Sequence, residues 1–65
     1  MTGTIKMYDK SNGFGFIVGE NGKEYYTKFD GLTAKEKSKA EKGVSVSFDL
    51  QEGLHGKEGV NVRLM

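Results

Sequence analysis

The sequence predicts an all-β fold, a small antiparallel barrel of five strands. Several short segments alternate apolar and polar residues, a pattern typical of strands with one buried face. Ten glycines and no proline in 65 residues indicate a chain with many tight backbone positions. Closing the strands into a barrel removes the unpaired edges that an open sheet of this size would expose.

The first three predicted strands occupy the N-terminal half of the chain, at residues 2–8, 13–18 and 23–29. The dipeptide Asn21-Gly22 lies between the second and third strands. It predicts a type I′ hairpin turn, in which both central residues have positive φ. We therefore expect these two strands to pair directly.

The last two strands are predicted at residues 44–51 and 59–64. The first of them is the clearest strand in the chain, because its apolar and polar residues alternate without a break. Alternation places seven apolar side chains inside the barrel: Val44, Val46, Phe48, Leu50, Val60, Val62 and Leu64. A loop punctuated by glycines joins the two strands.

Residues 33–43 break the strand pattern. Thr33 and Glu36 have the spacing of a helical capping box, and Gly43 is a candidate helix stop. The lysine-rich stretch between them has no apolar stripe, so we predict a solvated loop with room for one helical turn. The five strands together predict a barrel of the oligonucleotide-binding type (OB-fold), with residues 1–65 as one domain.

The central hairpin carries the candidate functional residues. Phe14 and Phe16 share one strand face, while glycines and Ile17 share the other. Because Ile17 needs the interior, the two rings are predicted to face solvent, with Tyr26 beside them and Tyr25 buried. A one-residue register slip would exchange the two tyrosines. Exposed rings with cations nearby form a platform for unpaired bases, so the pattern predicts binding of single-stranded nucleic acid.

Composition argues against several other functions. The net charge of +1 is too small for strong general attraction to a polyanion, so any such binding depends on where the charges lie. With no cysteine and one histidine we expect no disulfide, metal site or cofactor. No apolar run is long enough for a signal peptide or a membrane span, and we expect a cytoplasmic monomer with no small-molecule substrate.

Four sequence blocks resemble the cold-shock domain family. Residues 13–17, Gly-Phe-Gly-Phe-Ile, are similar to its first ribonucleoprotein motif, and residues 25–29, Tyr-Tyr-Thr-Lys-Phe, to its second. Residues 3–6 and 59–62 also fit, in the same order and spacing. The resemblance covers essentially the whole chain and implies an RNA chaperone that binds single-stranded RNA and DNA.

The resemblance also implies which residues contact nucleic acid. The family's stacking positions correspond to Tyr8, Phe14, Phe16, Tyr26 and Phe29. Its polar contacts near those rings correspond to Lys6, Asn12, Glu24 and Lys28. Two further positions complete the set, Met7 where the family usually has an exposed tryptophan and His55 where a basic residue is common.

Several of these positions depart from the family pattern. Met7 replaces a tryptophan, Lys28 a histidine and Asn12 a lysine, and the segment 33–43 lacks the aromatic residue common there. Each base–aromatic stack is worth about 1–3 kcal/mol, so lost rings weaken binding. Added lysines favour phosphate contacts. We therefore expect binding that is weaker, more salt-dependent and less base-selective than is usual in the family.

Some alternatives stay open at this point. Strict alternation puts Met7 in the core, and an exposed position requires a bulge in the first strand, with Tyr8 then partly buried and its hydroxyl at the rim. Phe29 ends its strand and suits burial nearly as well as stacking. The chain could also be a protein-interaction barrel derived from a cold-shock domain. An enzyme is disfavoured, because no nucleophile and base pair, metal cluster or phosphate loop is visible.

Overall fold

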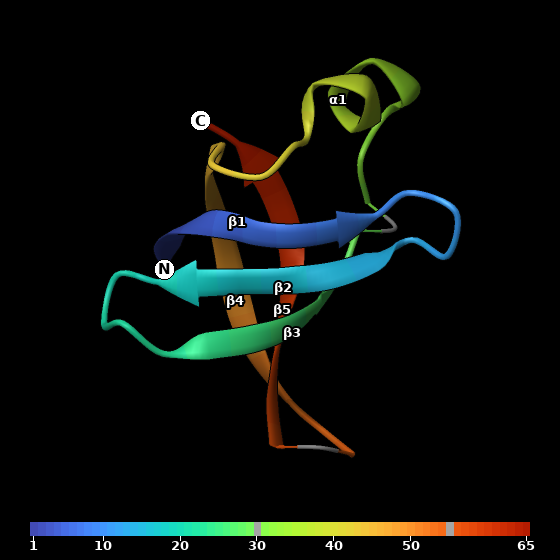
Figure 1. The fold of residues 1–65 in the computed structure, drawn as a ribbon. Coiled ribbons are helices and arrows are strands. Elements are labelled where there is room, and N and C mark those ends of the chain that lie inside the picture. The colour runs from blue at the N-terminus through green and yellow to red at the C-terminus, as the bar shows by residue number, and fades with distance from the viewer. Residues whose placement is uncertain (30, 55) are drawn as a thin grey trace.

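The computed structural model describes residues 1–29, 31–54 and 56–65. It contains a six-residue helix, α1 (Ala34–Lys39), and five strands: β1 (Thr2–Asp9), β2 (Phe14–Gly19), β3 (Glu24–Lys28), β4 (Ser45–Gly53) and β5 (Gly56–Leu64). The strands close into a barrel in the order β1-β2-β3-β5-β4. In Figure 1, β1, β2 and β3 form one layer, and β4 and β5 cross behind it at a steep angle. The predicted all-β five-stranded barrel is confirmed.

The barrel is mixed rather than fully antiparallel. β3 and β5 pair in parallel through Thr27 and Gly59, and the other pairs are antiparallel. Gly59 permits this contact, because a Cβ atom there would lie 2.6 Å from Oγ1 of Thr27. The prediction of an entirely antiparallel barrel is wrong at this seam. The chain passes through α1 and β4 before β5 returns beside β3 in the same direction.

The core lies between the two layers of strands. It contains Ile5, Ile17, Tyr25, Phe29, Leu32, Ala40, Val46, Phe48 and Val62. Three of the apolar residues predicted to face inward are fully buried there, Val46, Phe48 and Val62. The other four are half-buried, and Val44, Leu50 and Leu64 pack against the same cluster.

The turn between β2 and β3 differs from the predicted type I′ turn. The Gly22 amide donates to the Gly19 carbonyl at 2.9 Å, so Glu20 and Asn21 are the central residues. Only Gly22 has a positive φ, of 82°, among these residues. This arrangement matches a three-residue hairpin loop closed by a left-handed glycine, in which asparagine needs no positive φ.

Residues 33–43, for which the sequence predicts a solvated loop with room for one helical turn, contain the six-residue helix α1. Its capping box is present, with the Glu36 amide donating to Oγ1 of Thr33 and the Thr33 amide donating to Glu36. The helix has no buried residue of its own, but buried Leu32 and Ala40 anchor its two ends. Ala40 is the C-cap, so Gly43 is not the helix stop. Within the described ranges, no helix has the length and apolar character needed to cross a membrane.

Candidate nucleic-acid interface

A bulge in β1 brings Met7 to the outer face of the barrel. Ile5 pairs with Ile17, and Met7 pairs with Phe16, so Lys6 is an extra residue in β1. The bulge changes the phase of the strand, which buries Ile5 and leaves Met7 40% exposed. The bulge required for a surface Met7 is therefore present, and Met7 lies beside Phe16 rather than in the core.

The pairing of β2 with β3 brings three rings together on the same face. Phe16 pairs with Tyr26, and Phe14 pairs with Lys28. The Tyr26 ring is stacked with Phe14, with centroids 5.7 Å apart, and meets Phe16 edge to face at 5.9 Å. All three rings are half-buried. The prediction that they lie together outside the barrel is confirmed, and the register slip that would exchange Tyr25 and Tyr26 does not occur.

The opposite side of the same hairpin is fully buried, at Gly15, Ile17, Tyr25 and Thr27. Gly15 is required by packing, because a Cβ atom there would collide with the Met7 carbonyl oxygen and lie 3.0 Å from the Phe29 ring. A glycine between Phe14 and Phe16 thus lets β1 approach β2 closely. Gly15 inside the barrel and the rings of Phe14 and Phe16 outside it therefore depend on the same close approach of β1 to β2.

Tyr8 and Phe29 support the face from beneath. Phe29 is completely buried, and its ring lies 4.3 Å from that of Tyr8. A buried ring offers no face to a base, so Phe29 is removed from the predicted stacking set. Tyr8 is half-buried as expected, but its hydroxyl is not at the rim. The oxygen is buried without a hydrogen-bond partner among the described residues, and burial raises the pKa of Tyr8.

The charged residues around the rings differ in whether they already form an ion pair. Lys6 and Glu24 form an ion pair, so each partly neutralises the other. Both side chains are about half exposed, where such a pair contributes little to stability. Lys28 is exposed beside Phe14 and Tyr26, and no ion pair of it is found within the described part of the chain. Lys28 is thus the cation best placed to meet a phosphate.

Asn12 lies in the turn that precedes β2 and is held by Asp9. Its Nδ2 donates to the Asp9 carboxylate at 2.8 Å, and this bond, with backbone amides of Ser11 and Asn12, lowers the pKa of Asp9. Asn12 is exposed but already partnered. The predicted site residue His55 lies outside the described residues.

Two hollows flank Phe16 on this face. One, of about 290 Å³, is lined by Lys6, Met7, Phe16 and Glu24. The other, of about 460 Å³, is lined by Phe16, Tyr26, Lys28, Leu54 and Glu58. Leu54 and Glu58 are not among the site residues predicted from the sequence, because their place beside Lys28 depends on the pairing of β3 with β5. The sequence does contain one signal for Leu54, which is an apolar residue in an otherwise polar, glycine-rich loop.

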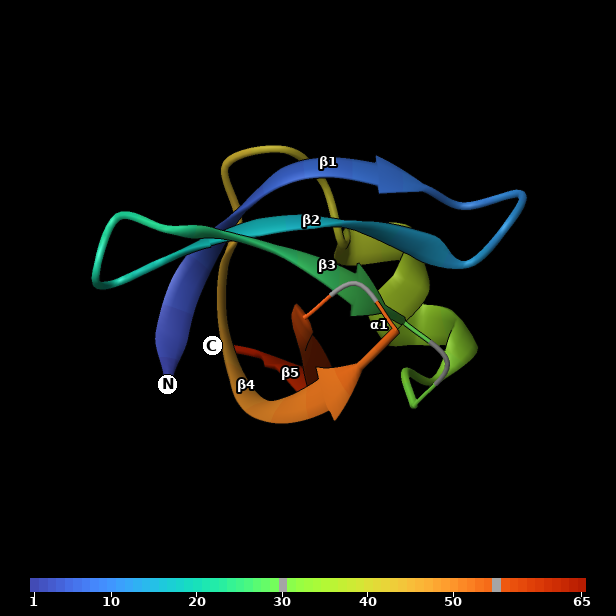
Figure 2. The same ribbon diagram turned by 90° about the horizontal axis from the view of Figure 1, so that it is seen from below.

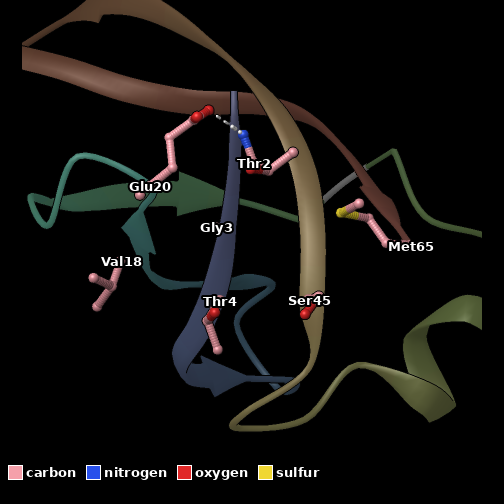
Figure 3. A pocket seen from close by; sticks show the side chains of 8 residues that line it. Thr2, Gly3, Thr4, Val18, Glu20, Ser45 and Met65 are labelled. Atoms are coloured by element: carbon pink, nitrogen blue, oxygen red, sulfur yellow. Dashed lines mark hydrogen bonds between the residues drawn. The ribbon is translucent and has the colours of Figure 1, made fainter.

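A third hollow, of about 380 Å³, lies at the other end of β1, away from the rings. Figure 3 shows its lining, with small hydroxyl side chains around β1 and Glu20 accepting from the Thr2 amide at 3.0 Å. It contains no aromatic residue and none of the predicted site residues. The candidate interface is therefore the outer face of β1, β2 and β3.

The sequence matches one family model and is similar to several curated proteins. The family model described as the "cold-shock" DNA-binding domain matches residues 1–65. The major cold shock protein of Streptococcus pyogenes serotype M1 is 37% identical over 60 residues, which cover 92% of this chain and 90% of that protein. Cold shock protein CspC of Bacillus subtilis is 34% identical over 61 residues, covering 94% and 92%. The cold shock-like protein CspE of Bacillus anthracis is 32% identical over 62 residues, covering 95% and 92%.

Proposed function

Because this chain belongs to the cold-shock domain family, whose members bind nucleic acid, we propose that it captures single-stranded RNA and DNA on the outer face of β1, β2 and β3. The observation that carries the proposal is the cluster of three half-buried rings, Phe14, Phe16 and Tyr26, on that face. Their outer surfaces take bases, and Lys28 contacts the backbone. Stacking is tolerant of sequence, because every base has a π-face.

The mechanism requires no energy source. A shallow sheet with exposed rings accepts splayed bases but not the stacked bases of a duplex. Binding only the unpaired form shifts a weak hairpin towards its melted state by mass action, as expected of an RNA chaperone. The protein acts as a monomer in this mechanism, and location in the cytoplasm remains a prediction.

The affinity is expected to be modest. Met7 contributes a polarisable thioether instead of a ring, which makes weaker contacts with a base. Phe29 is buried beneath Gly15, so it supports the face rather than extending it. The ion pair with Glu24 reduces the charge that Lys6 offers to a phosphate. The three rings and Lys28, for which no ion pair is found among the described residues, thus supply most of the binding, and Lys6 makes a second phosphate contact in exchange for its pair with Glu24.

Replacing Phe16 tests the proposal. Phe16→Ala should raise the Kd for a short oligothymidine by about tenfold or more, because one stack is worth about 1–3 kcal/mol. Fluorescence anisotropy at low salt measures the Kd, and an amide-shift NMR titration locates the contact. Val18→Ala is the matched control, since Val18 is also half-buried on β2 but lines the hollow away from the rings.

The fold of both variants must be compared by thermal unfolding. A Phe16→Ala domain that no longer folds would place that ring in the core and refute the mechanism. Unchanged affinity in a folded variant would refute it equally.

A second candidate function is binding of a partner protein. The exposed apolar side chains beside the rings favour it, since Leu54 is 98% exposed and Met7 40%. Such residues are frequent at protein interfaces. No oligonucleotide binding at low salt, together with a protein partner lost in Phe16→Ala, would select this function over the first.

A further inference from the structure

The larger hollow beside Phe16 combines a carboxylate with an ammonium group. The parallel contact of Thr27 with Gly59 creates this combination. Both of those residues are buried, so their chain neighbours Lys28 and Glu58 lie on the outer side of the seam. Figure 2 shows the β4–β5 hairpin on the side of the barrel next to β3.

Glu58 is held in place by the hairpin. A Cβ atom on Gly53 would collide with the Glu58 side chain, so that side chain lies across the Gly53 backbone. Glu58 is half-buried, and within the described residues neither it nor Lys28 takes part in an ion pair. In the smaller hollow, by contrast, Glu24 is already paired with Lys6.

We propose that the hollow lined by Phe16, Tyr26, Lys28, Leu54 and Glu58 selects guanine from a single strand. This inference rests on the proposed function and assigns a base preference to part of the same face. The rings and the exposed Leu54 side chain hold the flat base, and the two charged groups read its edge.

Donor and acceptor chemistry favours guanine over the other bases. A carboxylate only accepts hydrogen bonds, and a lysine ammonium only donates them. Guanine places two adjacent donors, N1–H and the 2-amino group, opposite the two oxygens of Glu58, while its O6 accepts one N–H of the Lys28 ammonium. The ammonium has three donors, so its other N–H groups stay available to the neighbouring phosphate. Thymine and uracil offer one N–H between two carbonyl oxygens, which the carboxylate repels. Cytosine and adenine offer one amino group each, beside a ring nitrogen that accepts.

The preference was not expected from the sequence, which predicts low base selectivity because of the missing rings. A carboxylate that already accepts hydrogen bonds from another side chain would support that expectation, because its oxygens could not also accept from a base. Glu58 differs because no ion pair or hydrogen bond of its carboxylate is found among the described residues, and because Glu58 lines the same hollow as Lys28.

The test uses a short oligothymidine of fixed length whose middle base is thymine, guanine or hypoxanthine. Hypoxanthine lacks only the 2-amino group of guanine. The guanine strand should bind about tenfold more tightly than the thymine strand, with hypoxanthine in between, as one well-made bidentate contact allows. Glu58→Gln should reduce the guanine preference to less than about twofold. Glu41→Gln is the control, because Glu41 is exposed and lines none of the three hollows.

Amide shifts provide a second measurement that does not depend on a variant. The guanine strand should shift Gly53, Leu54 and Glu58 more than the thymine strand does. If all strands bind without a guanine preference, or if Glu58→Gln keeps the preference, the inference is refuted and the proposed function stands. If no strand binds at low salt, both are refuted.

Discussion

Among the described side chains, the Tyr8 hydroxyl is a buried polar group without a hydrogen-bond partner. An unsatisfied buried hydroxyl costs about 1–3 kcal/mol, so a phenylalanine of the same shape fits this position better. The ring itself contributes to packing, because it lies against Phe29 under the candidate interface.

Tyr8→Phe should therefore raise the free energy of unfolding at neutral pH by about 1 kcal/mol, measured by urea unfolding. Burial raises the pKa of Tyr8, so the wild-type fold is favoured below the ordinary tyrosine pKa and loses this contribution as pH rises through the folded-state value. An absorbance titration should show a late-ionising tyrosine that the variant lacks. A variant less stable than wild type at neutral pH would show that the hydroxyl has a partner after all.

Individual residues also mark where prediction from sequence succeeds. Alternation identifies Phe14, Phe16 and Tyr26 correctly, because it is a local property of two adjacent strands. It also agrees with the burial of Phe29, which has the same parity as the buried Tyr25 and Thr27. The stacking role of Phe29 came from the family resemblance, and that assignment is wrong. Alternation does not identify Leu54 and Glu58, because their neighbours in the hollow come from β2 and β3.

At the level of elements, two strands contain irregularities that set which side chains face outward. The bulge at Lys6 turns Met7 outward. A second shift of register lies between the pairs Ser47 with Arg63 and Asp49 with Val60, next to Asn61 with a φ of 54°. Asparagine tolerates this left-handed conformation better than most residues, and a β-branched residue tolerates it poorly.

Asn61→Val should therefore lower the free energy of unfolding by about 1–3 kcal/mol, the cost of a non-glycine residue in strained backbone. Asn61→Gly is the matched variant and should be close to neutral, because glycine adopts positive φ readily. Denaturant unfolding of the two variants measures the difference. Equal stability of both would mean that the bulge does not require this backbone conformation.

The short helix shows how far an element can be predicted from its ends. The capping box of Thr33 and Glu36 is visible in the sequence and present in the structure. The helix itself was underestimated, because its stability comes from anchors outside it. Leu32 and Ala40 are buried against the barrel at either end, which an amphipathic pattern within the helix would not reveal.

For the molecule as a whole, the net charge determines how strongly a polyanion is attracted, and the fold determines which side chains can contact it. The net charge is only +1, so general electrostatic attraction is weak and contacts made by individual lysines dominate the salt response. The barrel and its five strands follow from alternation and glycine content. Its closure through a parallel β3–β5 seam does not, because that contact joins residues far apart in the chain.

The affinity for oligothymidine and oligouridine should fall with salt, with a slope of log K against log salt near −1.4. Each phosphate contact on a single strand contributes about −0.7, and we assign two contacts, to Lys28 and Lys6. Lys28→Gln should reduce the slope by about half, and Lys37→Gln on α1 is the control for an exposed lysine outside the predicted site. Affinity that is indifferent to salt would contradict the assigned role of the lysines.

The seam between Thr27 and Gly59 has one more consequence. The hollow that we propose to select guanine is made from strands that meet only when the barrel closes, so it does not exist in the unfolded chain. A ligand bound in that hollow therefore stabilises the closed barrel, and the Tm of the domain increases with the concentration of the ligand. Under the proposed function, unpaired nucleic acid would in this way help to keep the domain folded.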